Sequence, residues 1–169
     1  LSRYFSITVF YYNPNIYPGE EYFRRVAEQQ RLIAELPCVH PVSFVEGPYD
    51  TERFFQMAQG MEQFPEGGVR CFDCYRLRLE QAAKLCKEGG FDYFTTTLSI
   101  SPHKNAQKLN EIGEALAQQY GVRHLPSDFK KKEGYKRSIQ LSKEHGLYRQ
   151  DYCGCIFSKQ AAERRNSAE

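Results

Sequence analysis

Four of the six cysteines occur in two close pairs, and these pairs are the strongest chemical signal in the sequence. Cys71 and Cys74 stand three residues apart at the start of a segment with helical periodicity, so both sulfurs would face the same way in a first helical turn. The unpaired amides and the dipole of a helix start stabilise thiolates. The pair therefore suits a metal ion or a redox-active dithiol, with two merely structural thiols as the alternative.

The second pair is the Cys153-Gly154-Cys155 motif. Cysteines separated by one residue close only a small, strained ring on oxidation, and strained disulfides are the exchangeable kind. Alternatively both sulfurs bind a metal, or the spacing has no function. Together the two pairs provide four thiols, which match either a tetrahedral zinc site or an iron–sulfur cluster. Their spacing does not distinguish these two centres.

The two remaining cysteines are expected to be structural. Cys86 shares a helical stripe with Tyr75, Leu79 and Ala82, and a single cysteine on such a stripe is typically a small core residue. Cys38 lies between two prolines, where a loop thiol is expected. A nearby histidine gives only a weak metal signal.

Several polar residues are weaker candidates for function. His103 is either an acid–base group or, more simply, a solvated surface histidine. Asp128 follows a short predicted strand and suits either a functional carboxylate or a helix N-cap. Basic residues gather in the C-terminal third of the chain. They could bind phosphate groups, although a run of charged residues is usually only a solvated surface. The residues are Lys130, Lys131, Lys132, Lys136, Arg137, Arg149, Lys159, Arg164 and Arg165.

Predicted strands alternate with predicted helices along the chain. Runs of β-branched and aromatic residues bounded by turn signals predict strands at residues 6–12, 42–45, 91–98 and 122–125. Periodic apolar residues predict helices at residues 19–36, 50–61, 71–87, 104–120 and 133–145, followed by a loop and a final helix. Strands connected by helices of this length are typical of parallel βαβ units.

We therefore expect a single α/β domain over residues 1–169, with a doubly wound, Rossmann-like parallel sheet and helices on both faces. In such sheets ligands bind beyond the carboxyl ends of the strands. The loops at residues 13–18, 99–105 and 126–130 should gather at that edge.

Composition and motifs exclude several classes of protein. The 169-residue chain has 41% hydrophobic and 26% charged residues and a formal net charge of +2, which is not the composition of a disordered segment. The sequence also has no apolar run long enough to span a membrane. We expect a cytoplasmic protein, in which cysteines are more often metal ligands or redox groups than disulfides. The sequence has no phosphate-binding P-loop and no dinucleotide glycine fingerprint, which argues against an ATP-using enzyme.

Five segments resemble, in order and along nearly all of the chain, the QueH-type epoxyqueuosine reductases: FYYNPNIYPGEEY, PEGGVRCFDCYRLRLEQAA, FDYFTTTLSISPHKN, IGEALAQQYGV and GLYRQDYCGCIFS. The resemblance implies a fold similar to that of adenine-nucleotide α-hydrolases. It also implies reduction of the epoxide of epoxyqueuosine to queuosine in the anticodon loop of tRNA, with electrons from an external donor. A zinc-stapled tRNA- or protein-binding module without redox activity is the alternative.

The same resemblance assigns roles to the cysteines. Cys71 and Cys74 would bind a 4Fe-4S cluster, and Cys153 and Cys155 would form a redox-active disulfide. Members of the family begin with a strand that ends in adjacent cysteines, and this sequence has no counterpart to it. Because the chain starts at Leu1 rather than at a methionine, we expect a shortened N-terminus with two further cluster ligands upstream. True loss of those ligands is the other explanation.

Overall fold

The computed structural model describes residues 1–167, which form two compact units. The sheet unit consists of Leu1–Arg53 together with the chain from Glu144 onward, and the helical unit is Phe54–Lys143. The single domain expected over residues 1–169 stays a prediction.

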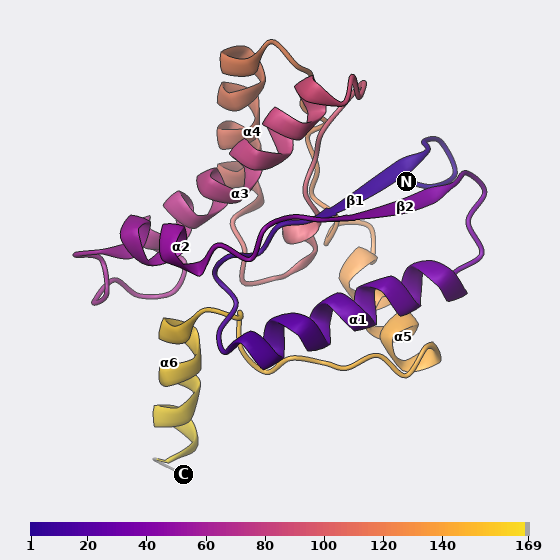
Figure 1. Ribbon diagram of the computed structural model, residues 1–169. Helices are drawn as coiled ribbons and strands as arrows, with labels where there is room; N and C mark the ends of the chain where they lie inside the picture. The colour runs from indigo at the N-terminus through magenta and orange to yellow at the C-terminus, as the bar shows by residue number, and fades with distance from the viewer. Residues whose placement is uncertain (168–169) are drawn as a thin grey trace. The chain divides into compact units, whose positions relative to one another are not determined.

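The sheet unit contains a parallel pair of strands joined by a helix. Strand β1 (Ile7–Tyr11) pairs with β2 (Val42–Glu46) in a register that runs from Ile7 opposite Val42 to Tyr11 opposite Glu46. Helix α1 (Gly19–Glu35) connects the two strands and lies alongside them (Figure 1). Parallel strands need such a crossover, because a tight turn can join only antiparallel neighbours.

Aromatic side chains form the core of the sheet unit. The buried side chains Ile16, Tyr22 and Val26 pack against Tyr11, Phe44 and Tyr49. The rings of Tyr22 and Tyr49 stack with centroids 4.0 Å apart. Tyr22 and Val26 are four residues apart on α1, so they lie on the one face that covers the strands. The unit also contains α6 (Ile156–Asn166), which begins directly after the second cysteine pair.

The helical unit is built around two helices that pack side by side, α3 (Val69–Glu88) and α4 (Ala106–Tyr120) (Figure 1). Its core combines one stripe from each helix with Phe94 from the connecting segment. The stripe of α4 contains Leu109, Ile112, Gly113 and Leu116, as the periodicity predicts. The other helices are α2 (Thr51–Ala58), which begins in the sheet unit, and α5 (Gly134–Glu144), which ends there.

Two predicted strands, at residues 91–98 and 122–125, are wrong. The structure has a single parallel bridge between Phe94 and His124 in their place. The first segment turns into a short 3-10 helix, η1 (Thr97–Ile100), because the side chain of Thr96 accepts a hydrogen bond from the backbone N–H of Leu98 and caps it. The aromatic and threonine residues gave this segment strand propensity, but the local cap ends the extended conformation.

The α/β class is confirmed, although the sheet of the described residues has two strands. The parallel pair with its crossover helix is consistent with a Rossmann-like fold. Two of the three predicted rim loops do come together in the helical unit, since the hydroxyls of Ser99 and Ser127 lie 3.1 Å apart and the Lys130 ammonium donates to the Lys104 carbonyl.

Candidate functional site

The Cys153-Gly154-Cys155 turn lies against the loop that follows β1. The backbone N–H of Tyr17 donates to the Gly154 carbonyl at 2.8 Å. The Tyr152 hydroxyl donates to the Tyr17 carbonyl at 2.7 Å. The turn therefore lies at the carboxyl end of a parallel strand, which is where α/β sheets place their ligand sites.

Gly154 allows the turn to lie this close. Its φ of 124° falls in the region that only glycine adopts readily, and a Cβ at this position would lie 3.0 Å from Nη1 of Arg25 and 3.2 Å from Cγ1 of Ile16. A larger residue between the two cysteines would thus push the turn away from α1 and from the loop after β1.

The two thiols of the turn interact directly. A hydrogen bond with Cys153 and burial raise the pKa of Cys155 far above that of a free thiol, and hydrogen bonds with Ser158 offset part of this effect. Cys155 is 9% exposed and forms the N-cap position of α6, whereas Cys153 is half-buried. Ser158 donates to the Cys155 carbonyl at 2.9 Å. The two sulfurs differ in environment although one residue separates them.

The N-terminal half of α1 anchors the segment that leads to the turn. The Arg25 guanidinium pairs with Glu21 at 2.7 Å and donates to the Cys153 carbonyl at 3.3 Å. The Tyr148 hydroxyl also donates to Glu21, and its ring lies 3.5 Å below the guanidinium carbon of Arg24. The backbone N–H of Tyr148 donates to Glu28 at 2.9 Å.

Sequence reasoning did not find this anchoring network. The Glu21 and Arg25 spacing of four residues is visible in the sequence, but it is also the spacing of an ordinary surface ion pair on a helix. Its special feature is burial, since only 10% of each side chain is exposed. That burial comes from the segment at residues 148–155, more than a hundred positions away.

The first cysteine pair lies in the helical unit, at the start of α3. The helix begins at Val69, so Cys71 and Cys74 fall in and just after its first turn, as predicted. The backbone N–H of Gly67 donates to the Cys71 sulfur at 3.3 Å. This bond fixes the position of the Cys71 sulfur relative to the loop that precedes α3.

Two charged side chains hold the loop that precedes Cys71. Arg70 is 5% exposed and donates to the carbonyls of Met61 and Glu62, each at 2.8 Å. The largely buried Lys104 pairs with Glu66 at 3.1 Å. The turn that carries the Gly67 amide is thus fixed from both sides.

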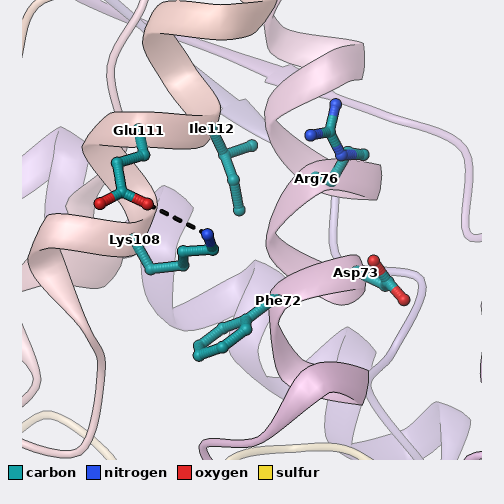
Figure 2. A pocket seen from close by; sticks show the side chains of 6 residues that line it. All are labelled: Phe72, Asp73, Arg76, Lys108, Glu111 and Ile112. Carbon is teal, nitrogen blue, oxygen red and sulfur yellow. Dashed lines mark hydrogen bonds and ion pairs between the residues drawn. The ribbon is translucent and has the colours of Figure 1, made fainter.

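A small hollow lies between α3 and α4, next to the first cysteine pair in sequence (Figure 2). Its volume is about 140 Å³, and its lining is Phe72, Asp73, Arg76, Lys108, Glu111 and Ile112. Figure 2 shows the Lys108 ammonium directed toward Glu111, with which it pairs at 3.0 Å. The hollow has room for only a small polar group, and its charges are mixed.

The other candidate residues differ widely in their exposure to solvent. Cys86 is 2% exposed in the core and its thiol donates to the Phe91 carbonyl, so the core assignment is confirmed. Cys38 is exposed, as is His103. The Asp128 carboxylate lies 3.5 Å from the Lys130 ammonium, and the N-cap alternative has no hydrogen bond to support it among residues 1–167.

The predicted cluster ligands form only part of a metal site. Within residues 1–167 no group of three or more histidine, cysteine or acidic side chains is arranged to hold a metal ion. An iron–sulfur cluster takes four ligands, and Cys71 and Cys74 supply two sulfurs near the start of one helix. The residues present therefore fit one half of such a centre. No helix of the described chain is both long and apolar enough to cross a membrane.

The fold and the two thiol pairs define a thiol-bearing α/β protein. A family model described as epoxyqueuosine reductase QueH matches residues 1–161, so the chain belongs to the epoxyqueuosine reductase QueH family, as the sequence motifs predict. Two relatives named epoxyqueuosine reductase QueH, from Staphylococcus epidermidis and Streptococcus pyogenes, are each 41% identical over 94% of this chain. One from Thermotoga maritima is 35% identical over 88% of it. The chain spans 68%, 63% and 77% of these three relatives respectively.

Proposed function

We propose that this chain carries the reductase chemistry named for its relatives, the reduction of epoxyqueuosine in the anticodon loop of a tRNA. Removal of the epoxide oxygen as water needs two electrons and two protons. An external electron donor would restore the enzyme after each turnover. The cytoplasm is the proposed location, because that is where tRNA would be met as substrate.

The observation that carries this proposal is the contact between the Cys153 and Cys155 thiols at the carboxyl end of β1. Two thiols that close to a disulfide release two electrons and two protons, which is what the epoxide requires. A disulfide across one intervening residue is strained, so a thiol reductant reopens it readily. The hydrogen-bonded turn around Gly154 keeps the two sulfurs together for this cycle.

Cys71 and Cys74 would supply two of the four ligands of a 4Fe-4S cluster. When bound, the cluster supplies single-electron transfer and a Lewis acid for oxygen. The chain's own contribution is to hold the two sulfurs in place. The Gly67 amide stabilises the Cys71 sulfur, and the Lys104–Glu66 pair keeps that amide in position.

The tRNA partner would be held through its phosphates by basic side chains of the C-terminal third. In the sheet unit, Arg149 and Lys159 lie within four residues of the cysteine turn on either side in sequence. Proteins read RNA in sequence-specific ways mainly at single-stranded loops, whose bases can leave the stack. An anticodon loop is single-stranded, so it presents a base that can leave the stack beside phosphates that basic side chains can bind.

Serine variants test the cysteine roles. Cys153→Ser and Cys155→Ser should each abolish multiple turnover on tRNA that contains epoxyqueuosine, measured by nucleoside mass spectrometry. Cys38→Ser is the matched control, because that thiol is exposed in a loop and should leave turnover unchanged. Unchanged turnover in either variant of the pair would remove the dithiol from the reaction.

Metal analysis separates the cluster from the zinc-stapled module. Anaerobically purified protein should contain iron and sulfide, and Cys71→Ser or Cys74→Ser should lower both. A colourless protein with one zinc per chain would instead favour the binding module without redox activity.

A further inference from the structure

Arg25 contacts the residues that carry the sulfurs of the second pair. Its Nη1 donates to the Cys153 carbonyl at 3.3 Å, and its guanidinium carbon lies 5.5 Å from the centre of the Tyr152 ring. Its Nε pairs with Glu21 at 2.7 Å, and nine tenths of the Arg25 side chain is buried. The positive charge is therefore fixed beside the turn and does not move freely in solvent.

One donor of this guanidinium is unused. Nη2 of Arg25 is buried and has no hydrogen-bond acceptor among residues 1–167. A buried donor without an acceptor is unfavourable, and this cost falls when an anion forms beside it. The groups next to Arg25 that become anionic during a thiol–disulfide cycle are the thiols of the turn.

The two thiols are unequal in access. Cys155 is buried at the start of α6 and contacts Ser158, whereas Cys153 is half-buried and its backbone already touches Arg25. A reagent or substrate from solvent therefore reaches Cys153 first. Burial and the hydrogen bond with Cys153 keep the pKa of Cys155 high, which further favours its protonated form.

We infer that Arg25 is a positioning residue for the redox pair: it holds the turn by the Cys153 carbonyl and stabilises the Cys153 thiolate, so Cys153 reacts first and Cys155 completes the disulfide. This inference rests on the proposed redox function. Over one turnover two thiols lose two electrons and two protons and one S–S bond forms. The two C–O bonds of the epoxide break, a carbon–carbon double bond forms between its two carbons, and the oxygen leaves as water.

Other charged and titratable groups also face Arg25 and the turn. Glu21 lies on the same helix, and Tyr148, Asp151 and Tyr152 belong to the segment that leads to the turn. Glu21 opposes a thiolate by its negative charge, but it is already paired with Arg25 and also accepts from the Tyr148 hydroxyl. Burial and the Glu21 charge raise the pKa of Tyr152 to about 12, so this hydroxyl stays neutral where thiols titrate.

The test measures alkylation of each cysteine in the chemically reduced protein by iodoacetamide, with peptide mass spectrometry as a function of pH. In the wild-type protein, Cys153 should react at least tenfold faster than Cys155 near neutral pH. Arg25→Gln should slow the reaction of Cys153 about tenfold and move its rate profile about one pH unit higher, as expected when a thiolate loses a neighbouring positive charge.

Arg3→Gln is the matched control, because Arg3 is an exposed arginine of the same unit that has no part in the network around the turn. It should leave the Cys153 profile unchanged. If Arg25→Gln fails to fold, Arg25→Lys serves, since it keeps the charge but loses the two-pronged contact, and an intermediate rate is expected.

Three results would overturn the inference: faster alkylation of Cys155 than of Cys153, an unshifted profile in folded Arg25→Gln, or a wild-type rate in Arg25→Lys. The assay contains no tRNA. A protein that shows the expected profile but no reductase turnover would therefore refute the proposed function and leave the thiol assignment standing.

Discussion

The backbone N–H of Tyr17 donates to the Gly154 carbonyl at 2.8 Å, which joins the loop after β1 to the turn that carries two cysteines. This bond crosses a large part of the sequence and places a thiol pair at the carboxyl end of a strand. The geometry of the turn depends on Gly154, whose φ of 124° puts its backbone against Arg25 and Ile16.

Gly154→Ala is expected to lower the free energy of unfolding by about 1–3 kcal/mol. The new Cβ would crowd the Arg25 side chain, and the alanine backbone would be strained at this φ. Gly60→Ala is the matched control, since Gly60 also has a positive φ but a Cβ there would meet nothing within 4 Å. Denaturant unfolding measures both. Equal losses in the two variants would show that crowding at Gly154 contributes nothing.

Arg70→Ala should destabilise the helical unit by about 2–3 kcal/mol, since it removes two charged hydrogen bonds to the carbonyls of Met61 and Glu62. The released loop should also expose Cys71 to faster alkylation. Arg76→Ala is the control, because Arg76 is exposed on the same helix. It should change the free energy of unfolding and the alkylation rate of Cys71 much less than Arg70→Ala does. A stable Arg70→Ala protein would contradict the anchoring role.

His124 should make stability depend on pH. Burial lowers its pKa below the ordinary 6.5, so the folded protein binds fewer protons at this site than the unfolded chain does. The stability that comes from neutral His124 is present above pH 6.5 and is lost as the pH falls below that value. Denaturant unfolding should show a flatter pH dependence in His124→Gln over this range.

His103→Gln is the control for this measurement, because His103 is exposed and should leave the pH dependence as it is. A His124→Gln protein with the wild-type slope would assign the pH dependence to other groups.

Cys86→Ser is expected to cost about 1–3 kcal/mol of unfolding free energy without changing the reactions of the other thiols. The cost arises because a hydroxyl replaces a thiol in an apolar core. Cys38→Ser, at an exposed position, should stay within about 0.5 kcal/mol of the wild type. Loss of alkylation at Cys153 in the Cys86 variant would link the core of the helical unit to the second cysteine pair and contradict this prediction.

Helices were predictable from the sequence because each carries a periodic apolar stripe that its neighbours bury. The stripe of α4 and the core position of Cys86 follow directly from such periods. The segments at residues 91–98 and 122–125 have strand propensity but are not strands, because this propensity has an effect only where a partner strand pairs over several residues. In the structure that pairing is limited to Phe94 and His124.

The cysteine pairs of the candidate site were visible in the sequence, since close spacing of a rare and reactive side chain is itself a signal. Their supports were not. Arg25, Glu21 and Tyr148 acquire their roles only when distant segments meet, and each looks like an ordinary polar residue in its local sequence. The distinction between Cys153 and Cys155 likewise comes from tertiary burial.

The contact between Arg25 and Cys153 joins residues 128 positions apart. On the ribosome, the N-terminal partner of this contact leaves the exit tunnel long before the cysteine turn is translated. The Cys153 and Cys155 thiols therefore acquire their guanidinium neighbour only after Arg25 has already been synthesised and the turn itself has been translated, so the contact cannot form in a shorter nascent chain.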